Sequence, residues 1–231
     1  MKNIEYGKMA YLYDKFYKNK DYKKEVDFIT TILGSKELKI LDAGCGTGNH
    51  AKILNDNNFE VYGFDQSKDM VNIANSKIKD HFFVENLLTI KSNDKFDAII
   101  SFFAVFNHLK NYKEFKLALS NLKNLLNPNG SIIIDLHNPL KNGRKTETID
   151  NITRIMKWKK CSLLKKEFSK IEYIIDGKKY KTNHIFKIFS IRKLQKIAME
   201  LGFLSIEFYE NYNISSPATN KSKNIQIVLR G

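Results

Sequence analysis

The chain has 231 residues, of which 39 are basic and 25 acidic, so its net charge is +14, and 42% of the residues are apolar. This length suits a single domain around one hydrophobic core, and the apolar fraction excludes an intrinsically disordered chain. No apolar run approaches the roughly 20 residues that a membrane-spanning helix needs.

Short apolar segments alternate with amphipathic segments over the first 140 residues. We expect strands at 39–41, 60–64, 81–84, 96–101 and 131–136. We expect helices at 50–57, 68–78 and 111–126, and a turn at 127–130. Strands that alternate with helices predict a parallel sheet that is covered by helices on both faces.

The pattern changes in the second half of the chain. Segments 170–175 and 180–186 flank Asp176-Gly177, a pair that favours a two-residue β-hairpin turn. We therefore expect an antiparallel patch over 141–189, followed by a helix at 190–201 with Gly202 as its C-terminal cap. Strands at 204–209 and 224–229 complete an α/β core formed by 1–140 and 190–231.

The cellular compartment is suggested by what the sequence lacks. The first residues contain no apolar segment of the kind that a signal peptide needs. Cys45 and Cys161 are the only cysteines, so neither a disulfide framework nor a structural zinc site is expected. We therefore expect a cytoplasmic protein.

A carboxylate followed by three glycines comes directly after the first of these strands, in the segment Asp42-Ala43-Gly44-Cys45-Gly46-Thr47-Gly48. Glycine lets the backbone take positive φ and approach a ligand closely. The spacing differs from the G-x-G-x-x-G of dinucleotide sites, and Asp42 would repel a pyrophosphate. The same carboxylate would attract the ammonium group of an amino acid.

Two later strand ends add polar side chains. Asp65 follows the second strand, about 17 residues after Gly48, where a carboxylate accepts hydrogen bonds from ribose hydroxyls; the alternative is that it caps the next helix. Asn86 follows the third strand and would contact an adenine amino group while Leu87 covers the ring. Alternatively, Asn86 is an ordinary turn residue.

Together these motifs resemble those of class I S-adenosylmethionine-dependent methyltransferases. The resemblance implies a Rossmann-like sheet of seven mostly parallel strands with an antiparallel last strand, S-adenosylmethionine as the cofactor, and an N-terminal helical lid. Within the class, the chain is most similar to the bacterial dTDP-amino-sugar N,N-dimethyltransferases, through Tyr13-Asp14-Lys15-Phe16-Tyr17 and the segment 102–109. It departs from them after the fifth strand, where they have Glu-Pro-Trp-Trp and this chain reads Asp135-Leu136-His137-Asn138-Pro139.

The resemblance also implies which residues contact the cofactor: Tyr22, Asp42, Gly44, Cys45, Gly46, Gly48, Asp65, Gln66, Met70, Asn86, Leu87 and Phe102. Tyr13 and His108 are expected to orient and deprotonate the methyl acceptor, because a histidine accepts a proton near neutral pH. Each residue also has an alternative role without catalysis: Tyr13 would pack in the core, and His108 would cap or pack against the following helix. Asp135 and His137 are expected to face the same cleft, and no metal site is expected.

The expected methyl acceptor is a small polar molecule, the amine of a nucleotide-linked amino sugar. The inserted segment 141–189 is expected to form a cap on the substrate side of the site. Methylation of oxygen in another small metabolite or glycan is an alternative. RNA methylation is less favoured, because Ser101-Phe102-Phe103-Ala104 stands where base-amine methyltransferases have Asn/Asp-Pro-Pro-aromatic. Residues 141–200 contain 17 Lys and Arg against 6 Asp and Glu, which indicates either a general richness in lysine or a face for an anionic substrate. No membrane partner is expected, and a homodimer is compatible with the sequence.

Overall fold

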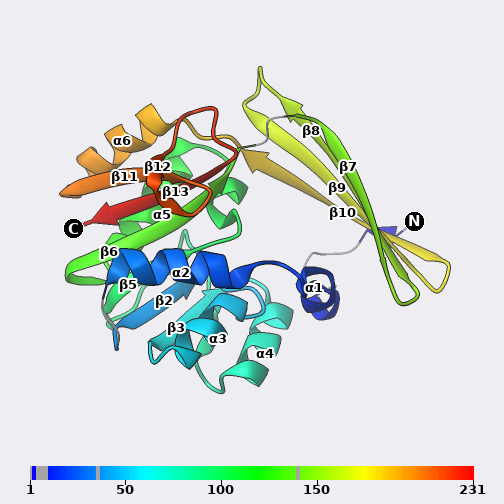
Figure 1. The fold of residues 1–231 in the computed structure, drawn as a ribbon, viewed down its shortest axis with the longest axis horizontal. Coiled ribbons are helices and arrows are strands. Elements are labelled where there is room, and N and C mark those ends of the chain that lie inside the picture. The colour runs from blue at the N-terminus through cyan, green and yellow to red at the C-terminus, as the bar shows by residue number, and fades with distance from the viewer. Residues whose placement is uncertain (1, 4–9, 35–36, 139–140) are drawn as a thin grey trace.

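Two β-sheets, one of eight strands and one of five, organise the part of the chain that the structure describes (Figure 1). The computed structural model describes residues 2–3, 10–34, 37–138 and 141–231. Pro139 and the expected boundary at 140 lie outside the described residues.

The eight-stranded sheet has the order β12-β11-β13-β6-β5-β2-β3-β4. Its strands are β2 (Lys39–Ala43), β3 (Glu60–Asp65), β4 (Phe82–Val84), β5 (Phe96–Ser101), β6 (Leu126–His137), β11 (Ser205–Glu210), β12 (Asn213–Pro217) and β13 (Asn224–Arg230). Strands β2 to β6 run parallel, and β13 is antiparallel to both β6 and β11. The expected Rossmann-like α/β sheet with an antiparallel last strand is confirmed.

The structure differs from the expectation in two places. β12 is an eighth strand that the sequence did not predict, because Asn-Ile-Ser-Ser-Pro lacks an alternating apolar pattern. The predicted turn at 127–130 is wrong, since these residues belong to β6. Leu126 pairs with Phe96, the chain bulges at Asn129 with φ +63°, and regular pairing resumes at Ser131.

Helices cover both faces of the eight-stranded sheet. They are α2 (Tyr22–Leu33), α3 (Asn49–Asp56), α4 (Lys68–Lys77), α5 (Tyr112–Lys123) and α6 (Ile191–Glu200). Neighbouring residues of one strand lie on opposite faces of the sheet. Ile40 of β2 belongs to the apolar cluster with α2, α3 and α4, and Leu41 belongs to the cluster with α5 and α6. No helix among the described residues is long and apolar enough to cross a bilayer.

The second sheet is antiparallel apart from its edge and has the order β1-β10-β9-β8-β7. Its strands are β1 (Lys2–Asn3), β7 (Gly143–Ile149), β8 (Ile152–Cys161), β9 (Lys166–Ile175) and β10 (Lys178–Lys187). Asp176 and Gly177 have φ of +48° and +73°, which is the left-handed turn expected between β9 and β10. Helix α1 (Ala10–Tyr17) packs Leu12 and Phe16 against this sheet. That this sheet is a substrate-side cap, and α1 a lid, stays a prediction.

Asn107 ties the two sheets together. It is fully buried in the short helix η2 (Val105–His108), and its amide nitrogen donates to the carbonyl oxygens of His137 at 2.9 Å and Lys187 at 2.7 Å. Its amide oxygen accepts from the His137 N–H at 2.8 Å. One side chain therefore fixes the end of β6, the end of β10 and η2 relative to one another.

We expect Asn107→Ala to lower the free energy of unfolding by about 2–4 kcal/mol, because it leaves buried backbone groups of two sheets without partners. Urea unfolding followed by circular dichroism measures this change. Asn183→Ala, at an exposed position of β10, is the matched control. Equal stability of the two variants would contradict the role given to Asn107.

Candidate active site

The bend between β2 and α3 is built from backbone that only glycine adopts easily. Gly44, Gly46 and Gly48 have φ of +82°, +53° and +77°. The N–H groups of Gly44 and Cys45 donate to the Phe64 carbonyl oxygen at 2.8 and 2.9 Å, which fastens the bend to β3. A Cβ atom at Gly44 would lie 2.7 Å from Val105, whereas one at Gly46 would meet open space.

Two other residues of the bend, Gly48 and Cys45, serve the packing of the protein. A Cβ atom at Gly48 would lie 3.1 Å from the Cβ of Ala74, so this glycine allows α3 and α4 to approach each other. Cys45 is buried, and burial raises the pKa of its thiol well above the usual range. A protonated, enclosed thiol is not a nucleophile.

Asp65 closes the bend from β3. Its carboxylate accepts from the Gly46 N–H at 3.1 Å and from the Ser67 N–H at 2.8 Å. Ser67, and not Asp65, caps α4, since its hydroxyl accepts from the Met70 N–H. Burial raises the pKa of Asp65.

Asp42 is a buried carboxylate with an unsatisfied oxygen. It is 1% exposed, and its Oδ2 atom has no hydrogen-bond partner among the described residues. Burial, with a smaller effect of the Asp65 charge, raises the pKa of Asp42 to about 6, although nearby His50 opposes the shift. An unpaired carboxylate beside the bend fits a ligand that brings a positive charge.

A cavity of about 790 Å³ opens in front of this bend. Ten of the expected residues line it: Tyr13, Gly44, Gly46, Asp65, Gln66, Met70, Asn86, Leu87, Phe102 and His108. Tyr22, Asp42, Cys45 and Gly48 do not. The cavity wall also includes residues that the sequence did not single out, among them Phe103, Val105 and His184.

Asn86 lines the cavity, and its side chain also stabilises the turn that follows β4. Its side-chain oxygen accepts from the Leu88 N–H at 2.9 Å, and its amide nitrogen lies 3.4 Å from the side-chain oxygen of Gln66. The turn interpretation and the ligand interpretation of Asn86 are therefore compatible.

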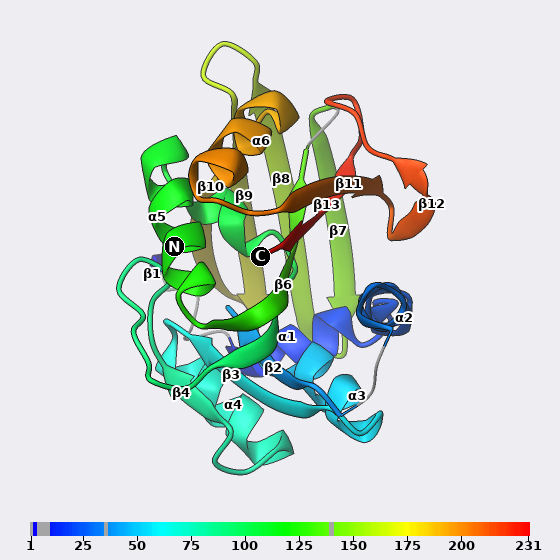
Figure 2. The same ribbon diagram turned by 90° about the vertical axis from the view of Figure 1, so that its left-hand side faces the viewer.

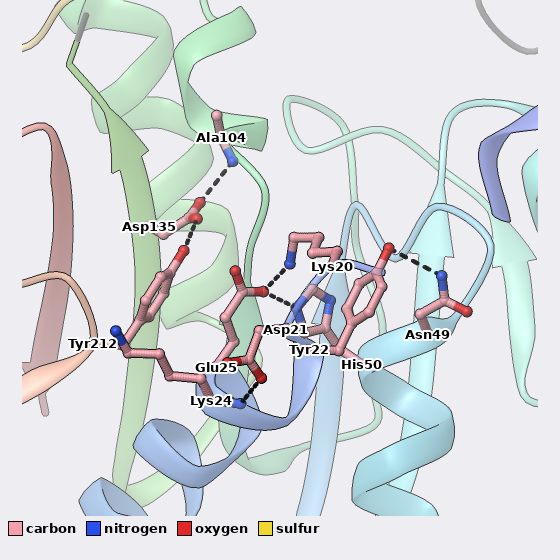
Figure 3. Close-up of polar contacts among 10 residues, drawn as sticks. All are labelled: Lys20, Asp21, Tyr22, Lys24, Glu25, Asn49, His50, Ala104, Asp135 and Tyr212. Atoms are coloured by element: carbon pink, nitrogen blue, oxygen red, sulfur yellow. Dashed lines mark hydrogen bonds and ion pairs between the residues drawn. The ribbon is translucent and has the colours of Figure 1, made fainter. Parts of the chain in front are cut away.

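Tyr22 lies at the start of α2 and supports α3 (Figure 3). Its hydroxyl oxygen accepts from the amide nitrogen of Asn49 at 3.1 Å, and the ammonium of Lys20 lies 4.1 Å from its ring centre. Burial raises the pKa of Tyr22 to about 12. The next turn of α2 contributes Glu25, which lies between Lys20 and His50 in Figure 3 and is 2.5 Å from the ring nitrogen of His50.

Asp135 holds a strained loop that contributes Phe103 to the cavity wall. Phe103 and Ala104 have φ of +70° and +61°, values that are unusual without glycine. Asp135 accepts from the Ala104 N–H at 2.6 Å and from the Tyr212 hydroxyl at 3.0 Å (Figure 3). Asp135 is thus occupied within the protein. His137 lies 3.5 Å from Glu167, and neither Asp135 nor His137 lines the cavity.

Two histidines meet in the cavity wall. His108 follows β5 and His184 lies on β10, with ring centres 5.8 Å apart and Phe186 packed against both. His108 is open to the cavity, yet the surrounding protein and His184 lower its pKa to about 4. Burial also lowers the pKa of His184, so both rings are neutral at pH 7. No feature of the sequence singled out His184, which is one polar residue in a strand.

Tyr13 reaches the same cavity from α1. Its ring lies 4.6 Å from Tyr17 and 5.9 Å from Phe103, centre to centre. This aromatic group connects α1 to the strained loop after β5. Among the described residues, no group of three or more His, Cys, Asp or Glu side chains could hold a metal ion.

Comparison with known proteins agrees with this geometry. The family model described as a methyltransferase domain matches residues 13–207. The chain belongs to the methyltransferase-domain family. An uncharacterised relative from Methanocaldococcus jannaschii is 31% identical over 229 residues, which cover 92% of this chain and 80% of that protein.

One further relative and two solved structures also resemble this chain. The dTDP-3-amino-3,4,6-trideoxy-alpha-D-glucopyranose N,N-dimethyltransferase of Streptomyces venezuelae is 27% identical over 132 residues, 54% of this chain and 56% of that enzyme. The crystal structure of an S-adenosylmethionine-dependent methyltransferase from Clostridium acetobutylicum superposes with a TM-score of 0.81 at 22% identity, over 97% of this chain and 98% of the other. The Streptomyces venezuelae DesVI structure has a TM-score of 0.76 at 19% identity, over 95% and 97% of the two chains.

We expect Asp42→Asn to stabilise this methyltransferase above pH 6. The folded pKa of about 6 exceeds the ordinary value of 3.8, so the folded state binds the proton more tightly than the unfolded chain, and stability is lost as the pH rises through that interval. Removing the charge should raise the free energy of unfolding by up to about 3 kcal/mol at pH 8, with the gain shrinking toward pH 4.

Urea unfolding of both proteins at several pH values measures this gain. Asp56→Asn, on the surface of α3, is the control and should show no such trend. A variant as stable as the wild type at pH 8 would contradict a charged, desolvated Asp42.

Proposed function

We propose that this chain is an S-adenosylmethionine-dependent methyltransferase that methylates the amine of a nucleotide-linked amino sugar. The observation that carries the proposal is one cavity lined both by the glycine bend with Asp65 and by Tyr13, His108 and His184. The family match supports methyl transfer. The named Streptomyces venezuelae relative supports an amino-sugar acceptor. The free thiols of Cys45 and Cys161 suit a reducing compartment such as the cytoplasm.

The cofactor half of the cavity follows from the residues of the bend. S-adenosylmethionine supplies an activated methyl group when bound. The carboxylate of Asp65 would accept the ribose hydroxyls, and Asn86 with Leu87 would frame the adenine. Asp42 lies behind the bend and does not line the cavity, so its buried charge would favour a cationic ligand through space and not by direct contact. The open space in front of Gly46 leaves room for close approach to the backbone.

In the half of the cavity that would bind the acceptor, methyl transfer needs an oriented acceptor and the exclusion of water more than it needs a strong base. A neutral His108 would accept a hydrogen bond from the N–H of the acceptor amine. Tyr13, on α1, would offer its hydroxyl group to the same acceptor. Because the His108 pKa is about 4, this histidine is a weak base at pH 7. That it takes the acceptor's proton stays a prediction, and holding the unprotonated amine in line is the role its chemistry favours.

We expect Asp65→Ala to weaken cofactor binding about 100-fold, which corresponds to roughly 3 kcal/mol for lost hydrogen bonds to a charged group. Titration calorimetry with S-adenosylhomocysteine measures the dissociation constant. Asp56→Ala on the surface of α3 serves as the control. An unchanged dissociation constant in Asp65→Ala would remove Asp65 from the cofactor site.

We expect His108→Gln to lower kcat at least about tenfold while leaving the affinity for S-adenosylhomocysteine unchanged, because the lost group contacts only the acceptor. With a pKa near 4, His108 should add no inflection to the wild-type kcat profile between pH 6 and 9. His81→Gln, outside the cavity, is the control. A wild-type kcat in His108→Gln would exclude His108 from the reaction.

The acceptor class is tested by offering the enzyme a dTDP-amino sugar, the same sugar with a hydroxyl in place of the amine, and RNA. Mass spectrometry then identifies the methylated atom. Transfer to the amine supports the proposal. Transfer only to the hydroxyl compound would favour O-methylation, and transfer only to RNA would favour an RNA methyltransferase.

A further inference from the structure

The turn between β8 and β9 presents apolar side chains to solvent. Leu163 is 92% exposed, more than any other large apolar side chain among the described residues, and Leu164 is 51% exposed. Phe168 and Ile185 stand directly opposite each other on β9 and β10 and are 40% and 51% exposed. Single exposed leucines are common, but four exposed large apolar side chains at one end of a sheet indicate a contact surface.

The same turn is held firmly in place. The N–H of Ile188 donates to the Lys165 carbonyl oxygen at 2.9 Å, and the ammonium of Lys187 donates to the Leu164 carbonyl oxygen at 3.3 Å. The turn projects beyond α6 at the top of Figure 2 and is also at the top of Figure 1. The leucines are therefore carried by an ordered hairpin that stands out from the molecule.

Several lysines lie near the two leucines of the turn: Lys165 and Lys166 follow them in the chain, and Lys187 bonds to the Leu164 carbonyl oxygen. Burial, followed by the charges of Lys166, Lys165 and Lys193, lowers the pKa of Lys187. None of the four lysines forms an ion pair with a carboxylate of the described residues. Like charges held together in this way repel one another, and an anionic partner would relieve that repulsion.

The chemistry of the tip distinguishes between the candidate partners. A second copy of the chain would bring the same lysines into contact and be repelled. Single-stranded nucleic acid binds through aromatic side chains on which bases stack, whereas the most exposed side chains here are aliphatic. An anionic bilayer surface offers both an apolar layer for leucines and negative headgroups for lysines.

We propose that the β8–β9 hairpin tip, residues Ser162–Lys165 with Lys166, Lys187 and Lys193 around it, docks the enzyme on anionic lipid surfaces. Leu163 and Leu164 enter the interface between headgroups and acyl chains, and the lysines contact anionic headgroups. This contact is peripheral and requires no spanning helix. It is independent of which acceptor the enzyme methylates.

Cosedimentation with vesicles tests the proposal. The wild type should pellet with phosphatidylcholine vesicles that contain phosphatidylserine, pellet less as salt rises, and stay in solution with phosphatidylcholine alone. Leu163→Asn/Leu164→Asn should weaken binding about tenfold. Lys165→Ala/Lys166→Ala should weaken it about fivefold for each lysine removed.

Matched controls test whether vesicle binding depends on this hairpin tip or on any exposed apolar or basic side chain. Leu204→Asn removes an apolar side chain that is 83% exposed elsewhere, and Lys178→Ala/Lys179→Ala removes two charges at the opposite end of the same sheet. Both should bind vesicles like the wild type, and every variant should keep the wild-type melting temperature and calorimetric affinity for S-adenosylhomocysteine.

Three results would overturn the proposal. The first is a wild type that does not pellet with phosphatidylserine vesicles at low salt. The second is an equal loss of binding in the control variants. The third is binding to a single-stranded oligonucleotide that is tighter than vesicle binding and unaffected by Leu163→Asn/Leu164→Asn.

Discussion

The left-handed backbone between β2 and α3 is the constraint on which the rest of the site depends. Two N–H groups of the bend bond to the carbonyl oxygen of Phe64, and a third, from Gly46, bonds to Asp65. These bonds fix the bend to β3, which leaves Gly44 and Gly46 of the bend and the end of β3 facing one cavity. A side chain at Gly44 would collide with Val105, so the bend also sets how closely η2 approaches.

Residues in the cavity wall and behind it store unfavourable energy. Asp42 keeps a carboxylate in a dry environment, and Phe103 with Ala104 keeps left-handed backbone without glycine. Asp135 holds that loop through a backbone hydrogen bond, itself at the cost of a buried charge whose pKa is raised by burial. Strain and buried charge of this kind persist where the surrounding structure enforces them, which is typical of sites that are organised before a ligand arrives.

The five-stranded sheet contributes His184 of β10 to the cavity wall. Asn107 bonds to both β6 and β10, and its neighbour His108 thereby comes to face His184. The relative from Streptomyces venezuelae matches only about half of this chain. The differences in acceptor among family members are expected to lie where this sheet and α1 meet the cavity, since we propose that the glycine bend holds the cofactor.

The sequence alone determined the alternation of strands and helices, the glycine bend, and the Asp176-Gly177 turn, because each depends on local backbone preferences and on the period of apolar residues. It also singled out Asp65 from its position at a strand end. Only the tertiary structure decided that His184 faces His108, that Asn107 joins two sheets, and that residues 127–130 continue a strand through a bulge. Those outcomes rest on partners many residues distant, and a linear pattern of residues carries no record of which distant backbone groups a side chain will meet.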